Sequence, residues 1–449
     1  MRIALTGGTI VKSLSPPQVA RTDLVVSLPR MEQVRFDGRV AGFGVEGRVT
    51  EQVDCAGCVV IPGLVCAHHH LYSSLARGMP YSLAPAKNFL QILKRMWWRL
   101  DRAMDLEIVH GSALVGGVDA LLAGTTTIVD HHASPNAIYG SLECIADALG
   151  SLGVRSALCY EVSDRDGAGC VEAGVGESRQ FLKEQRQLTR GMVGAHASFT
   201  LSPETLSACA ELANEFGVGI HVHVAEDTAD QRDSEARFGM RVIERLADAG
   251  ALGEDSLLAH CIHLSGREIE MVRDSGATVA HNARSNMNNG VGHAPVNGFA
   301  QLALGTDGIG GDMFAESKAA YWRARETDLE IVPQWSLERL AESSHFAGRA
   351  LDQPLLGTIQ PGAPADLVIL EYDPPTPLTD ENLAAHWVFG LSARHVRDVM
   401  VAGKWAVRNR RLVQADNEEL TARSRELADR LWHRMEEIDE HPFMPAGGR

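Results

Sequence analysis

Three consecutive histidines follow an apolar segment in the first part of the chain. His68, His69 and His70 come directly after GLVCA at 63–67. Side chains alternate between the two faces of a strand, so a strand here directs His68 and His70 to one side and His69 to the other. We therefore expect His68 and His70 to face one common site, and His69 to pack or to support that site from behind.

Other apolar segments along the chain also end in histidines or carboxylates. These residues are Asp130, His131 and His132; Glu161; His196; His221 and His223, with Glu226 just beyond; His260, with His263 close by; His281; and Asp307. Buried imidazole and carboxylate groups cost several kcal/mol unless they are paired or coordinated. A cluster of them needs a compensating partner, and a divalent metal is such a partner. The spacing does not decide which of His131 and His132 faces the cluster.

Eight strand-then-helix units carry these residues. The predicted strands are 63–68, 125–132, 154–161, 191–197, 218–224, 256–261, 277–282 and 302–307, and helical periodicity lies between most of them. Their number and length favour an α/β fold of the (β/α)8 TIM-barrel type over a doubly wound sheet. The carboxyl ends of barrel strands converge on one face, which holds the active site. This convergence predicts that the strand-end residues meet.

The two ends of the chain have the texture of a β-rich domain. Short β-branched runs separated by Gly, Pro and Asp occupy residues 1–60, and similar runs return after the central part. We expect residues 1–60 and 355–449 to form one flanking β-sandwich domain that includes a C-terminal helix. Residues 61–354 then form the metal-dependent barrel, and the tail at 441–449 is expected to be loose.

Composition limits the class of partner. The chain has 449 residues and a net charge of −16, which argues against nucleic acid or an anionic membrane as partner. No apolar run approaches ~18 residues and no signal peptide is recognisable, so a cytoplasmic enzyme acting on a small molecule is expected. The eight scattered cysteines indicate free thiols in a reducing compartment.

The motifs PGLVCAHHH, HVHVAED, LLAHC and LGTDG, in this order, resemble the amidohydrolase superfamily. Within it the pattern is similar to the cytosine, guanine and 8-oxoguanine deaminase branch, and WWRLDRAM, VDHHASP and HNARSNMNN resemble the SsnA group of aminohydrolases most. The resemblance implies one divalent metal, usually zinc and sometimes iron, bound by His68, His70, His223 and Asp307. It also implies that Glu226 shuttles protons and that His260, with Asp307, polarises the attacking water. His221 matches no required role and is expected in the core.

The resemblance implies a hydrolytic deaminase of a small nitrogen heterocycle, purine-like or pterin-like, that releases ammonia. One alternative is hydrolysis of another C–N bond or of a C–Cl bond, as in triazine hydrolases. A non-catalytic barrel is another, although it would be expected to lack ligands. Related enzymes are often dimers or larger, so a homo-oligomer is expected. A lysine on the fourth strand, typical of binuclear members, is replaced by His196.

Candidate substrate-binding residues follow from position. They are Ser73, Trp98, His196, His281 and Arg284, with Trp97 and Asn286 as further candidates. Guanine-type deaminases tend to carry a glutamine where this chain has Ser73, and a serine is shorter and offers a single hydroxyl. We therefore expect guanine to be a poor substrate and a substituted purine, a pterin or another heterocycle to be better.

Overall fold

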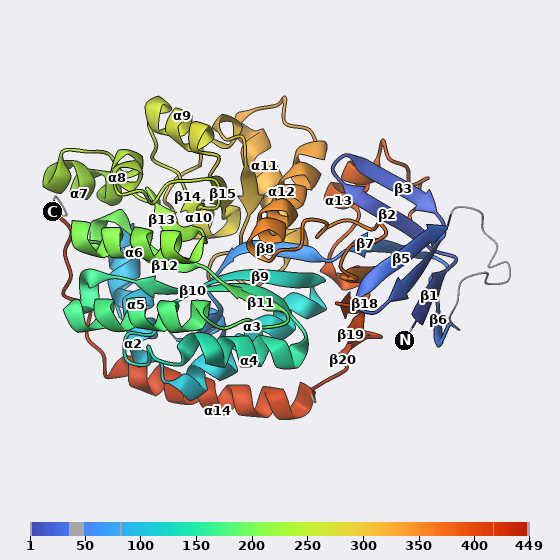
Figure 1. The fold of residues 1–449 in the computed structure, drawn as a ribbon, viewed down its shortest axis with the longest axis horizontal. Helices are drawn as coiled ribbons and strands as arrows, with labels where there is room; N and C mark the ends of the chain where they lie inside the picture. Colours follow the sequence, from blue (N-terminus) through green and yellow to red (C-terminus); the bar gives the residue numbers. More distant parts are fainter. Residues whose placement is uncertain (1, 36–48, 81–82, 416, 447–449) are drawn as a thin grey trace.

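Eight parallel strands form a nearly closed barrel in the structure, a computed structural model that describes residues 2–35, 49–80, 83–415 and 417–446 (Figure 1). The strands are β8 (Leu64–His69), β9 (Thr125–His132), β10 (Arg155–Val162), β12 (Val193–Ala197), β13 (Ile220–Val224), β14 (Leu257–His260), β15 (Thr278–His281) and β16 (Leu302–Leu304). The last strand meets the first through a bridge between His69 and Asp307, and Thr306 N donates to His68 O at 2.8 Å. The predicted barrel is confirmed.

Helices surround the barrel. They are α3 (Leu106–Leu122), α4 (Ser141–Leu152), α5 (Ala168–Leu182), α6 (Pro203–Phe216), α7 (Thr228–Phe238), α8 (Val242–Asp248), α9 (Gly266–Ser275), α10 (Ala283–Asn289), α11 (Met313–Thr327) and α12 (Gln334–Ala350). Local sequence sets several of their ends. Ser202 caps α6 by accepting from Thr205 N ahead of Pro203, and Ser265 and Glu268 form a capping box on α9.

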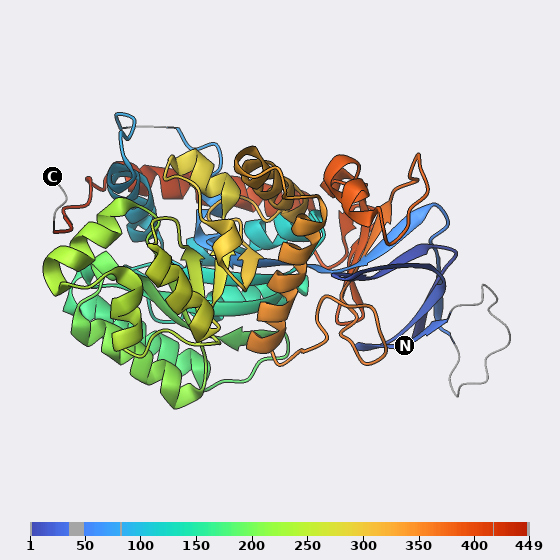
Figure 2. The ribbon, with the colours of Figure 1, turned by 90° about the horizontal axis from the view of Figure 1, so that it is seen from above.

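Two further sheets lie beside the barrel (Figure 2). One contains β5 (Arg30–Arg35), β4 (Asp23–Ser27), β1 (Arg2–Thr6) and β6 (Glu51–Asp54). The other contains β20 (Arg411–Leu412), β19 (Lys404–Arg408), β18 (Val396–Val401), β17 (Leu367–Glu371), β7 (Cys58–Pro62), β2 (Thr9–Leu14) and β3 (Pro17–Arg21). Strand β7 pairs with β17, so segments from both chain ends share one sheet. Buried side chains of both sheets, including Ile3, Leu24, Val60 and Ile369, form a common core, as the predicted flanking sandwich requires.

The C-terminal helix α14 (Asn417–Glu436) packs on the barrel, although the sequence grouped it with the flanking sheets. Figure 1 shows α14 along the lower edge of the barrel. It packs against α3, where Gly111 leaves room for the side chain of Leu427. Arg430 forms ion pairs with Asp105 and Glu107, and Trp432 Nε1 donates to Leu75 O at 2.9 Å. An apolar stripe on a helix buries against whichever surface its linker can reach, and that surface is not encoded in the helix itself.

The described part of the tail, residues 441–446, contacts the barrel, contrary to the expectation of a loose tail at 441–449, whose residues 447–449 lie outside the described residues. The side chain of His441 is buried, and the rings of His441 and Phe443 lie 5.2 and 5.8 Å from Trp98. All eight cysteines are unpaired, in agreement with the expected free thiols. Within the described residues, no helix combines the length and the apolar character that crossing a membrane requires.

Candidate active site

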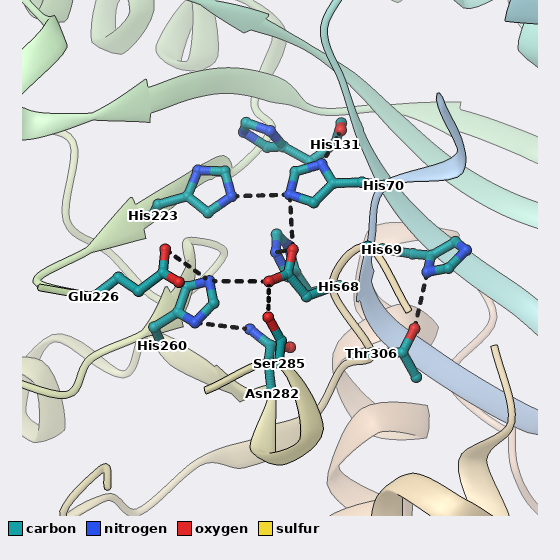
Figure 3. A network of polar contacts seen from close by, with 12 residues as sticks. His68, His69, His70, His131, His223, Glu226, His260, Asn282, Ser285 and Thr306 are labelled. Carbon is teal, nitrogen blue, oxygen red and sulfur yellow. Dashed lines mark hydrogen bonds and ion pairs between the residues drawn. The ribbon is translucent and has the colours of Figure 1, made fainter. Parts of the chain in front are cut away.

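Four side chains converge at the carboxyl end of the barrel (Figure 3). His70 Nε2 lies 3.1 Å from both His223 Nε2 and Asp307 Oδ1, and His68 Nε2 lies 3.7 Å from the same Asp307 oxygen. Zinc ligands at 2.0–2.1 Å in a tetrahedral arrangement are separated by about 3.3 Å. The separations of these nitrogen and oxygen atoms therefore fit coordination of one metal ion.

Hydrogen bonds orient two of the ligand rings. His70 Nδ1 donates to His131 O at 2.6 Å, and His223 Nδ1 donates to His196 O at 2.8 Å. A carbonyl oxygen only accepts, so the proton of each neutral ring is on Nδ1. The Nε2 lone pair of each ring is then directed to the metal position, the arrangement that metal-binding histidines need.

The third ring is oriented through a longer relay. His68 Nδ1 lies 2.7 Å from His221 Nε2, His221 Nδ1 lies 3.6 Å from Cys159 Sγ, and that thiol lies 3.4 Å from Asp130 O. The relay ends on a carbonyl acceptor, so each preceding group donates in turn and His68 Nε2 keeps its lone pair. The sequence assigned His221 to the core, whereas the structure places it directly behind a ligand.

Two buried nitrogen atoms at this site have no partner. His68 Nε2 and His260 Nε2 make no hydrogen bond, although buried polar atoms are nearly always satisfied. The donor atoms of His68, His70 and His223 lie within 4.8 Å of one another, as do those of His68, His260 and Asp307. Three imidazoles and a carboxylate suit zinc or a similar divalent metal, so the residues present fit the metal that the resemblance implies.

The acid–base residues lie beside the ligands. Glu226 Oε2 is 3.5 Å from His260 Nε2, which is 3.9 Å from Asp307 Oδ2. His260 Nδ1 is held by Asn286 Oδ1 at 2.8 Å. Burial, together with the negative charge of Asp307, raises the pKa of Glu226 well above its ordinary value. This shift favours the protonated form, which a proton donor needs.

The backbone turns sharply where these side chains leave the barrel. Ala225, His260 and Asp307 have positive φ values of 45°, 73° and 54°. Such conformations are costly for residues with a Cβ and concentrate at functional sites. Asp230 supports one of the turns, because its carboxylate accepts from Ala225 N at 2.9 Å and from Phe199 N at 3.0 Å.

Helix α10 supplies two residues that the sequence analysis missed. Ser285 donates to Asp307 Oδ2, and Asn289 Nδ2 donates to Glu226 Oε1 and to Ser285 Oγ, each at 3.3 Å. The predicted Arg284 points elsewhere and pairs with the buried Glu316 at 2.5 Å. Adjacent helical residues point in different directions, whereas residues four apart share a face. The helical spacing of Ser285 and Asn289 was the available signal.

A cavity of about 690 Å³, including its open mouth, leads to the ligands. It is lined by His70, Tyr72, Phe89, Leu90, Leu93, Trp97, Trp98, Glu161, His196, Ala197, Phe199, His223, Glu226, Asp227, Ala229, Asp230, Asn289 and Asp307. The structure therefore places the predicted Trp98 and His196 at the cavity. Burial lowers the pKa of His196 to about 3, so its imidazole is neutral there.

Ser73, His281 and Arg284 are absent from that lining among the described residues. Ser73 Oγ donates to His70 O at 2.8 Å and lies 3.0 Å from Gly308 O, so its hydroxyl is directed at the backbone. His281 is buried, and both of its ring nitrogens lack a partner. Ser73 was predicted to face the pocket because it follows the end of a strand. It instead lies in a 3-10 helix (Leu71–Ala76) that directs its side chain away from the cavity.

The paired histidines of β9 separate as alternation requires. His131 lies in the metal-ligand cluster, with its ring 4.7 Å from that of His223, and Figure 3 shows it above His70. His132 Nε2 instead bonds Ser134 Oγ at 2.8 Å on the other side of the strand. In the same way, His69 points away from the ligands and bonds Thr306 Oγ1 at 2.8 Å.

Residues 59–406 match the amidohydrolase family model. The chain belongs to the amidohydrolase family. A 5'-deoxyadenosine deaminase of Methanopyrus kandleri is 29% identical, with 96% of this chain and 99% of that protein covered. A zinc-bound adenosine deaminase structure from Xanthomonas campestris has a TM-score of 0.82 at 23% identity, covering 96% and 98% of the two chains. The zinc complex of the atrazine chlorohydrolase TrzN from Arthrobacter aurescens TC1 has a TM-score of 0.81 at 23% identity, covering 95% and 100%.

These findings confirm the predicted family, fold and enzyme class. This amidohydrolase is a hydrolase that acts on carbon–nitrogen bonds, and its family relatives carry deaminase names. The two solved structures contain zinc, and this chain has a histidine and carboxylate cluster that could hold a metal. The identity of the metal stays a prediction, as do the roles of individual site residues.

Proposed function

We propose that this protein is a mononuclear zinc-dependent deaminase that hydrolyses the amino group of a purine-like heterocycle. One observation carries the proposal: His70, His223 and Asp307 of the cluster line the same cavity as Glu226, and His260 Nε2 lies 3.5 Å from Glu226 Oε2. His68, His70, His223 and Asp307 would hold the metal. When bound, it lowers the pKa of a coordinated water toward ~7 and so supplies a nucleophile at neutral pH.

The surrounding residues then accept and donate the protons of the reaction. Asp307 Oδ2 accepts a proton from the water, and the Ser285 hydroxyl that contacts this oxygen keeps it in place. Glu226 donates a proton to the ring nitrogen beside the attacked carbon, a role that suits its raised pKa. It then takes the proton of the new C–OH group and gives it to the departing amine, and the proton on Asp307 returns Glu226 to its protonated form. His260 Nδ1 donates to Asn286 Oδ1, so Nε2 can accept a hydrogen bond from the attacking water and polarise it.

The cavity wall suits a flat ring. Phe89, Trp97, Trp98 and Phe199 contribute aromatic faces, and polar side chains such as Glu161, His196 and Glu226 line the same cavity. Aromatic side chains stack on planar heterocycles through dispersion and their quadrupoles. The names of the relatives, 5'-deoxyadenosine deaminase and 5-methylthioadenosine/S-adenosylhomocysteine deaminase, support an adenine-type ring as the reacting group. A cytoplasmic location and a homo-oligomer remain predictions.

Product release tests the proposal. Zinc-loaded protein is incubated with 5'-deoxyadenosine, adenine, guanine, 8-oxoguanine, isoxanthopterin and chlorinated or aminated triazines, and ammonia and chloride are both measured. We expect ammonia from at least one purine or pterin. Chloride release alone would instead support triazine-type hydrolysis, and no release from any ring would contradict a deaminase.

A further inference from the structure

Glu161 is a buried carboxylate that the proposed chemistry does not use. It lies near the end of β10, is 5% exposed and lines the cavity beside His196. Its Oε1 accepts from Arg165 Nη1 at 2.6 Å, and its Oε2 lies 3.2 Å from His131 Nδ1. A carboxylate has about four acceptor positions on its two oxygens. These two contacts leave acceptor capacity on a wall of the cavity.

The charge inventory around Glu161 favours a further donor. The single guanidinium of Arg165 contacts Glu161, the buried Asp101 and also Asp166, at 3.2 Å. Asp166 has a second cation in Arg102 at 3.6 Å, but Asp101 and Glu161 share Arg165. Buried carboxylates with incomplete compensation are costly. A ligand that brings hydrogen-bond donors to Glu161 would reduce that cost.

His196 presents a second acceptor at the same place. The hydroxyl of Thr200 donates to Ala197 O at 3.1 Å, so its oxygen accepts from His196 Nδ1 at 2.6 Å. With the ring proton on Nδ1, His196 Nε2 carries a lone pair. This nitrogen lies 3.9 Å from Glu161 Oε1, too far for a direct hydrogen bond. Two acceptors therefore face each other across a gap without a proton between them.

The gap is close to the metal-ligand cluster. His196 O holds the ligand His223, and the two rings are 5.5 Å apart. A carboxylate oxygen of Glu161 lies within 4.8 Å of a ring nitrogen of His223. Trp98 keeps this wall rigid, because its ring contacts His196 and lies under the Arg165 guanidinium at 5.5 Å. A group bound in the gap would belong to the reacting ring itself.

We propose that Glu161 and His196 together bind a substrate group with two hydrogen-bond donors, such as a second amino group on the ring. The inference rests on the proposed deaminase function and names its substrate class: a heterocycle that carries a donor group besides the amine that is hydrolysed. A metal held by His131, Glu161 and His223 is the competing explanation of this cluster. It is disfavoured because both nitrogens of His223 are already engaged and Arg165 supplies the positive charge.

Two ring compounds of equal size test the proposal. 2,6-Diaminopurine and 2-methyladenine share the reactive 6-amino group and differ only in an amino or a methyl group at position 2. We expect zinc-loaded wild type to prefer the diamino ring by at least about tenfold in kcat/KM, the effect of one buried donor–acceptor pair. Glu161→Met keeps a side chain of similar length but removes both acceptor oxygens, and the preference should fall to within about threefold.

Asp101→Asn is the matched control. It perturbs the same Arg165 cluster but lies outside the cavity lining, so the tenfold preference should persist. Thermal unfolding of both variants confirms that each is folded. The proposal is overturned if wild type has equal kcat/KM for the two rings, or if Glu161→Met keeps the full preference.

A binding measurement separates this inference from the proposed function. Calorimetry with zinc-loaded Glu226→Gln protein gives the Kd for each ring without turnover. A preference in Kd that the added Glu161→Met change abolishes supports the acceptor pair even if no ammonia is released. Ammonia release from both rings with equal Kd values would support the deaminase and reject the acceptor pair.

Discussion

The two ends of strand β10 carry buried charges that differ in how far other groups of the protein satisfy them. Near its start, Arg155 binds Asp366 through two contacts at 2.8 and 3.0 Å, and Asp366 also accepts from Ala402 N at 2.7 Å. Near its end, Glu161 lines the cavity, and His68 Nε2 and His260 Nε2 at the same end of the barrel make no hydrogen bond. The Arg155–Asp366 pair connects the barrel to the flanking sheets. Glu161 and the two histidine nitrogens have unused hydrogen-bonding capacity that a bound ligand could fill.

The contrast teaches how to tell a structural charge from a functional one. Both regions are buried, and both contain charges that would be costly alone. Only at the amino end of the barrel do the described contacts satisfy the paired groups. At the carboxyl end, where barrel enzymes have their active sites, the proposed metal and substrate would supply the partners. Changes at the two ends should therefore affect different measurements.

Loss of a ligand should have the largest effect. His68→Ala removes one of three imidazoles from the cluster and should eliminate tight metal binding and nearly all activity, while wild type binds about one zinc or iron per chain. Elemental analysis after gel filtration measures the metal content. Full metal content in the variant, or two metals per chain in wild type, would contradict a mononuclear site with this ligand.

Removal of the proton donor should be nearly as severe without loss of metal. Glu226→Gln preserves size and the bond to Asn289 but cannot transfer a proton, so kcat should fall by about 10²–10⁴-fold. Steady-state kinetics and metal analysis of the same sample measure this. An activity within a few-fold of wild type would assign the acid–base role to another residue.

At the opposite end of β10, the expected effect is on stability. Asp366→Ala leaves Arg155 buried without its partner and should lower the free energy of unfolding by about 3–5 kcal/mol. Metal content and kcat of the folded protein should be unchanged. Urea denaturation measures the loss, and the double variant Arg155→Met/Asp366→Ala should recover part of it. A loss of kcat without a loss of stability would contradict a purely structural role for the Arg155–Asp366 pair.

Behind the ligands, the effect should be smaller and confined to metal affinity. His221→Phe removes the acceptor for His68 Nδ1 and should weaken metal binding by about 10–100-fold. Competition with a chromogenic chelator measures the affinity. His281→Phe is the control, because it replaces another buried histidine that makes no contact with the ligands. Equal affinities in the two variants would mean that the relay does not support the site.

The smallest effect is expected at Ser73. Its hydroxyl is directed at His70 O and Gly308 O, so Ser73→Ala should cost roughly 1 kcal/mol of stability and change the preference between guanine and 8-oxoguanine by less than about threefold. Poor activity on guanine remains a prediction, but its cause would then lie elsewhere in the cavity. A large change in the preference between guanine and 8-oxoguanine would show that Ser73 does determine substrate selectivity.

Much of this protein could be predicted from its sequence. Strand alternation separated His68 and His70 from His69, and the eight strands were located to within a few residues, because both follow from local periodicity. The ordered motifs identified the family, and the ligand set that they imply stays a prediction. Local patterns could not indicate that α14 packs on the barrel, that the tail reaches Trp98, or that Ser73 turns away from the cavity.

Sequence alone determined which residues could do chemistry, because residue type and strand position are properties of the chain. Tertiary structure decided which of them meet. Glu161 and His196 are 35 residues apart in the chain, yet their acceptor atoms lie 3.9 Å apart. Cys159, His221 and His68 form one relay across three strands. Such contacts depend on hydrogen-bond direction and packing between distant segments, which no local pattern specifies.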